Sequence, residues 1–257
     1  MQLVRDEEDI LPRIDLRIPA PWHEPGALIA ALLKQQTGYE LTEHDFRHIG
    51  TGNTFDWGVS GPDDGMAELF MSGRGYTEEE IEAIRKHRLK FHLIGPGGSV
   101  AAAKAILHAA CALCAAGGLG ILVDNSGVTH VASEVNRMSE DSSLDVLFFA
   151  FINVVHGREA MFSHGMHCFG LRDAELPFPP DREISSRILI NLLMYTLESD
   201  TPVLDGDPLG DEDGPLFEVH HQPCTRVPAS SPFHNPYGVW RIEPIEKESL
   251  EEDSPET

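Results

Sequence analysis

The 257-residue sequence predicts an α+β fold in which two ferredoxin-like halves pack as one globular unit. Three observations support this class. Alternating polar and apolar segments recur between helical ones, the N-terminal half has the element order β-α-β-β-α-β, and the C-terminal half roughly repeats that order. This order is typical of a split βαβ unit, whose sheet is mostly antiparallel with helices on one face. No repeat of the sequence itself accompanies the repeated order of elements.

The N-terminal half, residues 13–95, begins with alternating polar and apolar residues, as a half-buried strand does. Pro25 suits the first turn of the helix that follows. Thr77 and Glu80 match a capping box, which predicts the start of a second helix. The strands of this half are expected at 13–18, 54–60, 66–72 and 88–94.

The C-terminal half, residues 96–198, starts with a long helix of small residues, which Gly117 and Gly118 end. Helices are expected at about 100–116, 133–138 and 183–197. Strands are expected at 119–123 and, as a hairpin, at 145–155 and 160–170, with weaker candidates at 215–221 and 238–243.

Acidic and loop-forming segments surround this core domain of residues 13–198. Residues 1–12 are expected to form an acidic extension, residues 199–245 a Pro-, Gly- and Asp-rich connection with C-terminal strands, and residues 246–257 an acidic disordered tail. The formal net charge is -23, and residues 198–218 alone contain eight acidic residues and no Lys or Arg. These segments either aid solubility or steer the protein toward a basic partner. Nucleic acid is not expected to bind, because it carries charge of the same sign.

Composition favours a cytoplasmic location. No apolar run approaches the roughly 20 residues of a membrane span, so no membrane association is expected. The acidic N-terminus lacks the apolar stretch of a signal peptide. The four cysteines are too few for a disulfide scaffold. Cys111 and Cys114 stand among Ala and Leu in a helix and are expected to be small core residues.

Two histidines and a cysteine gather in the segment 163–173. His164, His167 and Cys168 are candidate zinc ligands, and distant partners are available in His220, His221 and Cys224. On a strand, His164 and Cys168 share one face at about 13 Å, and His167 points to the other face. A bulge at Gly165 could change that geometry. The favoured interpretation is a structural strand with partly buried histidines, so no metal or other cofactor is expected.

Asp124, His130 and His167 are the candidate catalytic residues. Asp124 and His130 flank a turn after a predicted strand, where a site could form. A hydrolase or metal-dependent enzyme would require the three side chains to converge in one pocket. The turn chemistry of residues 124–127 is the simpler interpretation. Ser163 has no nucleophile elbow around it, so the sequence favours a role without catalysis.

The loop Gly95–Ser99 joins a predicted strand to a helix. Gly97, Gly98 and Ser99 could offer backbone amides to an anion or nucleotide. The loop lacks the lysine of a P-loop and the spacing of a dinucleotide fingerprint. The favoured alternative is a tight turn in which Ser99 caps the helix.

Several segments together resemble a bacterial family, domain-of-unknown-function family 4261. The resemblance covers about residues 13–200 and is carried by residues 21–23, 75–77, 97–99, 116–120, 126–130 and 165–173. Its most specific element is Gly-Met-His followed by Gly-Leu and an acidic residue. The family implies no activity and no catalytic residues. It does imply a cysteine at the position that His164 occupies here, which weakens any ligand role shared at that position.

The sequence therefore predicts a soluble bacterial protein that binds another protein, in an immunity-type or accessory role. Its acidic surface would complement a basic partner. The small hydrolase and the anion- or nucleotide-binding module described above are the alternatives.

Overall fold

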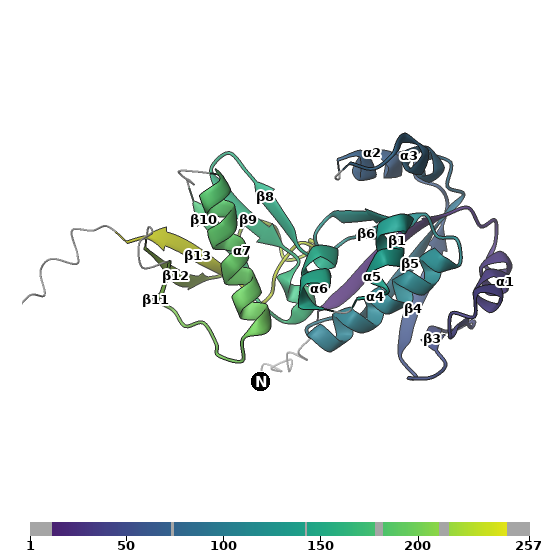
Figure 1. The fold of residues 1–257 in the computed structure, drawn as a ribbon, viewed down its shortest axis with the longest axis horizontal. Coiled ribbons are helices and arrows are strands. Elements are labelled where there is room, and N and C mark those ends of the chain that lie inside the picture. The colour runs from purple at the N-terminus through teal and green to yellow at the C-terminus, as the bar shows by residue number, and fades with distance from the viewer. Residues whose placement is uncertain (1–11, 73–74, 142, 178–181, 211–215, 246–257) are drawn as a thin grey trace, which may run out of the picture.

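The computed structural model describes residues 12–72, 75–141, 143–177, 182–210 and 216–245. It confirms the α+β class, with helices and two sheets of seven and six strands. Figure 1 shows the N-terminal sheet on the right of an elongated molecule and the C-terminal sheet on the left. The predicted tail, and the predicted acidic extension apart from residue 12, lie outside the described residues.

The first sheet is antiparallel in every pair of neighbouring strands and has the order β2-β3-β4-β5-β1-β6-β7. Its strands are β1 (Arg13–Ala20), β2 (Tyr39–Leu41), β3 (Phe46–His48), β4 (Thr54–Ser60), β5 (Leu89–Pro96), β6 (Gly120–Val123) and β7 (Val128–Val131). The helices around it are α1 (Pro25–Gln35), α2 (Met66–Met71), α3 (Glu78–Arg85), α4 (Val100–Ala115) and α5 (Ala132–Met138).

A ferredoxin-like core lies inside this sheet, but it ends later in the chain than residue 95. The four strands β4-β5-β1-β6 take the split βαβ order, with α1 following β1 and α4 following β5. The segment 66–72, expected as a strand, is instead helix α2, which buries Met66, Ala67 and Phe70 on one face. The fourth strand of the unit is consequently β6.

The second sheet has the order β11-β12-β13-β10-β9-β8 and is not ferredoxin-like. Its strands are β8 (Asn153–His156), β9 (Ala160–His164), β10 (Asp173–Pro177), β11 (Asp207–Leu209), β12 (Phe217–Gln222) and β13 (Val239–Pro244). Strands β8 to β10 follow one another as antiparallel neighbours, and α7 (Arg182–Glu198) then carries the chain to β11. The chain returns through β13, which pairs with β10 in parallel. The expected halves therefore differ in topology, and residues 199–245 contribute strands to this sheet.

The first arm of the predicted hairpin is mostly helical. Helix α6 (Leu144–Phe151) begins where the Ser143 hydroxyl accepts a hydrogen bond from the Val146 amide. It buries Leu147, Ala150 and Phe151, whose spacing is that of one helical face. The composition of a short apolar run fits a helix or a strand equally well, and here the cap at Ser143 favours a helix.

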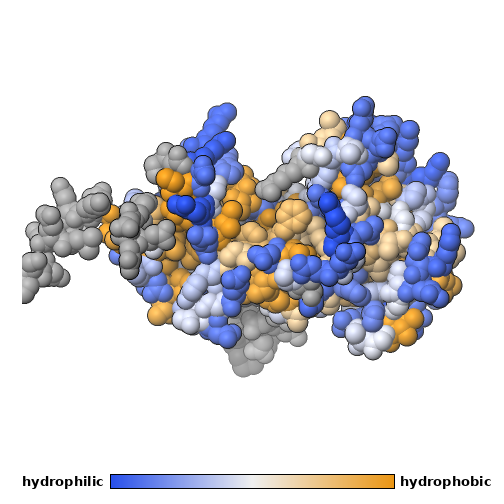
Figure 2. All heavy atoms as spheres, in the orientation of Figure 1, coloured by the Kyte–Doolittle hydropathy of each residue, from blue (hydrophilic) through white to orange (hydrophobic). Residues whose placement is uncertain are grey.

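One large hydrophobic cluster connects the two sheets. It runs from Leu16 and Leu93 of the first sheet through Ile106 of α4 to Leu189 of α7 and Trp240 of β13. Figure 2 shows hydrophilic residues toward the right of the visible face and apolar residues gathered near its middle. Among the described residues, no helix is long and apolar enough to cross a membrane.

Candidate functional site

The segment 163–173, here called the histidine turn, is a strand end followed by one turn of 3-10 helix. Strand β9 stops at His164, and the 3-10 turn η1 (Met166–Phe169) follows. Gly165 and Gly170 flank η1 with φ of 113° and 82°. A Cβ at Gly165 would overlap the carbonyl oxygen of Phe151, and one at Gly170 would overlap that of Gly98. The two glycines therefore allow both the reversal of the chain and the close approach of neighbouring backbone.

Asp173 holds the histidine turn from inside. Its carboxylate accepts hydrogen bonds from the Ser163 hydroxyl at 2.9 Å, the Met166 amide at 3.2 Å and Asn235 Nδ2 at 2.7 Å. Burial raises the pKa of Asp173 to about 6, although the bonds from Asn235, Met166 and Ser163 act in the opposite direction. The Asp173 carboxylate therefore has a structural role, because its hydrogen bonds are made within the fold.

His167 is buried and its ring is fixed by Asn125. Asn125 Nδ2 donates to the Arg13 carbonyl at 2.8 Å and lies 3.0 Å from His167 Nε2. Because Asn125 donates, Nε2 accepts and the ring proton resides on Nδ1. Burial, followed by the nearby His164 and His234, lowers the pKa of His167 to about 4. His167 thus stays neutral near pH 7 and connects the turn to β1.

His164 and Cys168 do not join His167 in a metal site. The His164 ring packs against Phe162 and Phe233, and burial, with a smaller effect of Arg226, lowers its pKa to about 4. Cys168 belongs to the hydrophobic core. Within the described ranges, no group of three His, Cys, Asp or Glu side chains is arranged to hold a metal ion.

The structure does not bring Asp124, His130 and His167 together. Asp124 accepts a hydrogen bond from Arg17 Nε at 2.7 Å on the sheet face, where burial raises its pKa and Arg17 partly offsets that effect. His130 has Glu134 at 3.1 Å from Nδ1 and the Ala150 carbonyl at 3.2 Å from Nε2. His130 lines a cavity that neither Asp124 nor His167 lines. The convergence required by the enzyme hypothesis is absent from the described residues.

In the loop Gly95–Ser99, the amides of Gly97 and Gly98 donate to carbonyl groups of the protein. The Gly97 amide donates to the Pro12 carbonyl at 2.7 Å, and the Gly98 amide donates to the Cys168 carbonyl at 2.9 Å. The Ser99 hydroxyl accepts from the Ala102 amide and so caps α4. Two of the three groups of the predicted anion site are therefore occupied by the protein itself.

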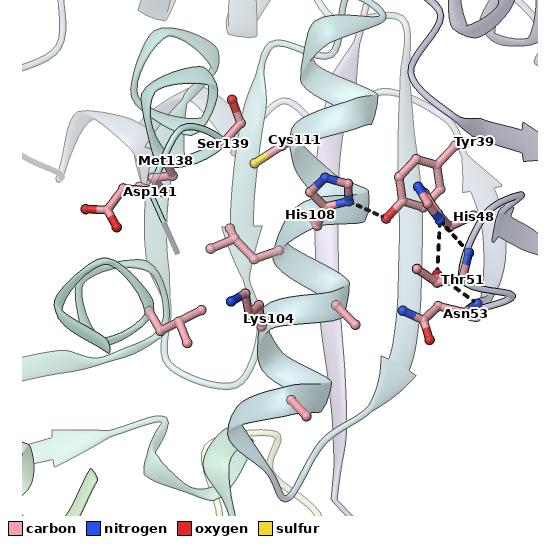
Figure 3. Close-up of a pocket in the computed structure, with 14 residues that line it drawn as sticks. Tyr39, His48, Thr51, Asn53, Lys104, His108, Cys111, Met138, Ser139 and Asp141 are labelled. Carbon is pink, nitrogen blue, oxygen red and sulfur yellow. Dashed lines mark hydrogen bonds between the residues drawn. The ribbon is translucent and has the colours of Figure 1, made fainter. Parts of the chain in front are cut away.

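A groove along the outer side of α4 combines apolar walls with polar groups that face its interior. It has a volume of about 330 Å³ and is bounded on one side by residues of the β2–β3 region and on the other by the segment after α5. Figure 3 shows Lys104 and His108 on α4 between Tyr39, His48, Thr51 and Asn53 on one side and Met138, Ser139 and Asp141 on the other. We call this feature the α4 groove.

Three rings fix the polar side of the α4 groove. The Tyr39 hydroxyl lies 2.9 Å from His108 Nδ1, and the Thr51 amide donates to His48 Nδ1 at 2.9 Å. The His48 and His108 ring centroids are 5.7 Å apart. Burial raises the pKa of Tyr39, so the phenol stays neutral. When the phenol donates to Nδ1, the N–H of His108 lies at Nε2 and is left for other contacts. Burial and the neighbouring His48 lower the pKa of His108.

The α4 groove was not among the sites predicted from the sequence. The available signal was the pair Lys104 and His108, four residues apart in a helix otherwise made of Ala, Leu, Ile, Val and Cys. Such a pair places two polar groups on one exposed face. The predicted core position of Cys114 is confirmed, and Cys111 is also buried in the core, although it touches the groove.

Comparisons with models of protein families, with curated proteins and with solved structures find no match to this chain. The resemblance to family 4261 therefore stays a prediction.

Proposed function

We propose that this protein is a binding protein without catalytic activity, and that the α4 groove takes a small ligand with an apolar body and an acidic end. The observation that carries this proposal is the convergence of Lys104, His108 and Asn53 on one hollow with apolar walls. Pockets of this size, with few polar groups on apolar walls, are typical of small-molecule sites.

The chemistry of the groove favours a carboxylate. Lys104 is exposed on α4, and it forms no ion pair with a described residue. The Lys104 ammonium and an N–H of His108 would bind the acidic end. Met138 and Leu147 would contact the carbon skeleton. Asp141 across the groove would disfavour a ligand with acidic groups at both ends.

Titration with benzoate and its neutral analogue benzamide, followed by NMR shifts of groove amides, tests the proposal. Ala101→Phe fills the groove from an exposed position of α4, and Ala115→Phe places the same side chain at an exposed position outside it. Saturable benzoate binding that is lost in Ala101→Phe and kept in Ala115→Phe is expected. Equal shifts with benzamide, or retention in Ala101→Phe, would contradict the proposal.

A basic protein partner in the cytoplasm is the second candidate, favoured by the formal net charge of -23. Such attraction weakens as salt screens it. In pull-downs from the protein's own cells, a partner should bind at about 50 mM NaCl and dissociate at about 500 mM. Absence of any salt-dependent partner would remove the support for this candidate, and Ala101→Phe should leave the interaction unchanged.

A further inference from the structure

A second hollow lies at the end of the histidine turn, far along the chain from the α4 groove residues. It has a volume of about 360 Å³ and lies between residues 170–172, the C-terminal end of α7 with residues 199–203, and the pair Tyr237 and Trp240. We call it the Arg172 hollow. It shares no lining residue with the α4 groove, so what binds in one can be tested apart from the other.

Arg172 is held in place without a carboxylate. Its guanidinium carbon lies 4.7 Å from the centroid of the Trp240 ring, a cation–π contact. Its Nε is buried and has no hydrogen-bond partner in the part of the chain that the structure describes. Among the described residues it forms no ion pair, in a chain with 42 acidic residues. The guanidinium therefore lines the hollow with a positive charge that no described carboxylate neutralises, which suits an anionic ligand.

Several residues with hydroxyl groups line the hollow beside Arg172. Ser199, Thr201 and Tyr237 are among them, and so is Thr196, whose hydroxyl already donates to the Leu193 carbonyl at 2.8 Å. The Ser199 hydroxyl oxygen accepts from the Thr201 amide at 3.0 Å, which leaves its own proton free to donate. One arginine and several hydroxyl groups can donate more hydrogen bonds than the two oxygens of a planar carboxylate accept. Such a set of donors suits a tetrahedral oxyanion.

Asp200 is the only carboxylate among the described residues that line the hollow, and it makes no ion pair with Arg172. Its negative charge would weaken the binding of an anion. Removing that charge should therefore strengthen binding, which a variant that merely unfolds cannot imitate.

We propose that the Arg172 hollow is a binding site for a phosphate group, either as inorganic phosphate or as a phosphate monoester. Arg172 would bind two oxygens of the phosphate through its planar guanidinium, and the surrounding hydroxyls would bind the others. The ring of Trp240 keeps the guanidinium oriented before the anion arrives.

The indole N–H signal of Trp240 reports on this site directly. The protein has three tryptophans, so Trp22 and Trp57 supply internal reference signals in the same NMR spectrum. We would titrate the full chain with inorganic phosphate, phenyl phosphate and acetate at constant ionic strength. A saturable shift of the Trp240 signal with both phosphates, and not with acetate, is expected, and the tighter of the two identifies the source.

Three variants complete the test. Arg172→Gln should weaken phosphate binding at least 10-fold, and Asp200→Asn should tighten it several-fold. Arg158→Gln removes the same charge from an exposed position outside the hollow and should change nothing. Acetate binding as tightly as phosphate, no tightening in Asp200→Asn, or an equal loss in Arg158→Gln would overturn the proposal.

Discussion

The histidine turn and the α4 groove hold similar side chains, yet they differ in whether the polar groups of those side chains are accessible to a ligand. In the turn, Asp173 accepts three hydrogen bonds and His167 Nε2 faces Asn125, while His167 Nδ1 is buried without a hydrogen-bond partner among the described residues. In the groove, the Tyr39 hydroxyl pairs with one nitrogen of the exposed His108 and leaves the other. A cluster of reactive residue types thus identifies a site only where free donors, acceptors or charges can be reached from solvent.

The largest effect is expected from Asp173→Ala. The change leaves Ser163, Asn235 and the Met166 amide without their buried acceptor. The free energy of unfolding should fall by about 4 kcal/mol, measured by urea denaturation. Asp64→Ala, in an exposed loop, is the control and should change it by less than about 0.5 kcal/mol. A small loss in Asp173→Ala would mean that the turn is not held in this way.

Gly165→Ala should destabilise the protein by about 3 kcal/mol, because it combines a left-handed backbone with overlap at Phe151. Gly52→Ala separates the two causes. Gly52 also has a positive φ, of 73°, but a Cβ there meets open space. That variant should lose only about 1 kcal/mol in the same measurement. Equal losses in both variants would show that the turn is less tightly packed than described.

Acidification should weaken the fold through the histidines of the turn. The pKa of His164 and of His167 is lowered from 6.5 to about 4, so their stabilising effect is complete above pH 6.5 and is lost as the pH falls toward about 4. Asp173 acts in the opposite sense, since its raised pKa makes its burial less unfavourable below about pH 6.

His167→Gln isolates one of these contributions. Between pH 6.5 and 4 the variant should lose up to about 3 kcal/mol less of its unfolding free energy than the unmodified protein. Parallel pH profiles for the two proteins would show that His167 titrates normally and is not buried as described.

The smallest effect on stability is expected in the groove. Lys104→Gln should change the free energy of unfolding by less than about 0.5 kcal/mol, because Lys104 is exposed and makes no ion pair with a described residue. The same variant should weaken benzoate binding about 10-fold by calorimetry, since it removes a charge-assisted hydrogen bond. Loss of stability without loss of binding would reverse the comparison between the two regions.

Local signals in the sequence were enough for most helix starts. Pro25, the pair Thr77 and Glu80, and Ser99 stand where α1, α3 and α4 begin. The segments 66–72 and 145–151 could not be assigned from short apolar runs, because burial against the rest of the chain decides between helix and strand.

The site was harder to predict than the fold. The contact between Tyr39 and His108 joins positions 69 residues apart, and no local pattern connects them. The histidine turn attracted attention because its residue types suit metals and catalysis. Only the positive φ of Gly165 and Gly170 and the bonds to Asp173 explain why those residues stand there.

Carbethoxylation of histidines at pH 7, mapped by mass spectrometry, tests most directly whether the histidines of the turn are inaccessible and His108 of the groove is accessible. The exposed His44 and His156 provide internal reference rates. We expect His108 to react in the folded protein, more slowly than these two because Tyr39 contacts its Nδ1, whereas His130 and His167 should react only after unfolding. Reaction of His167 as fast as His44, with His108 protected, would contradict it.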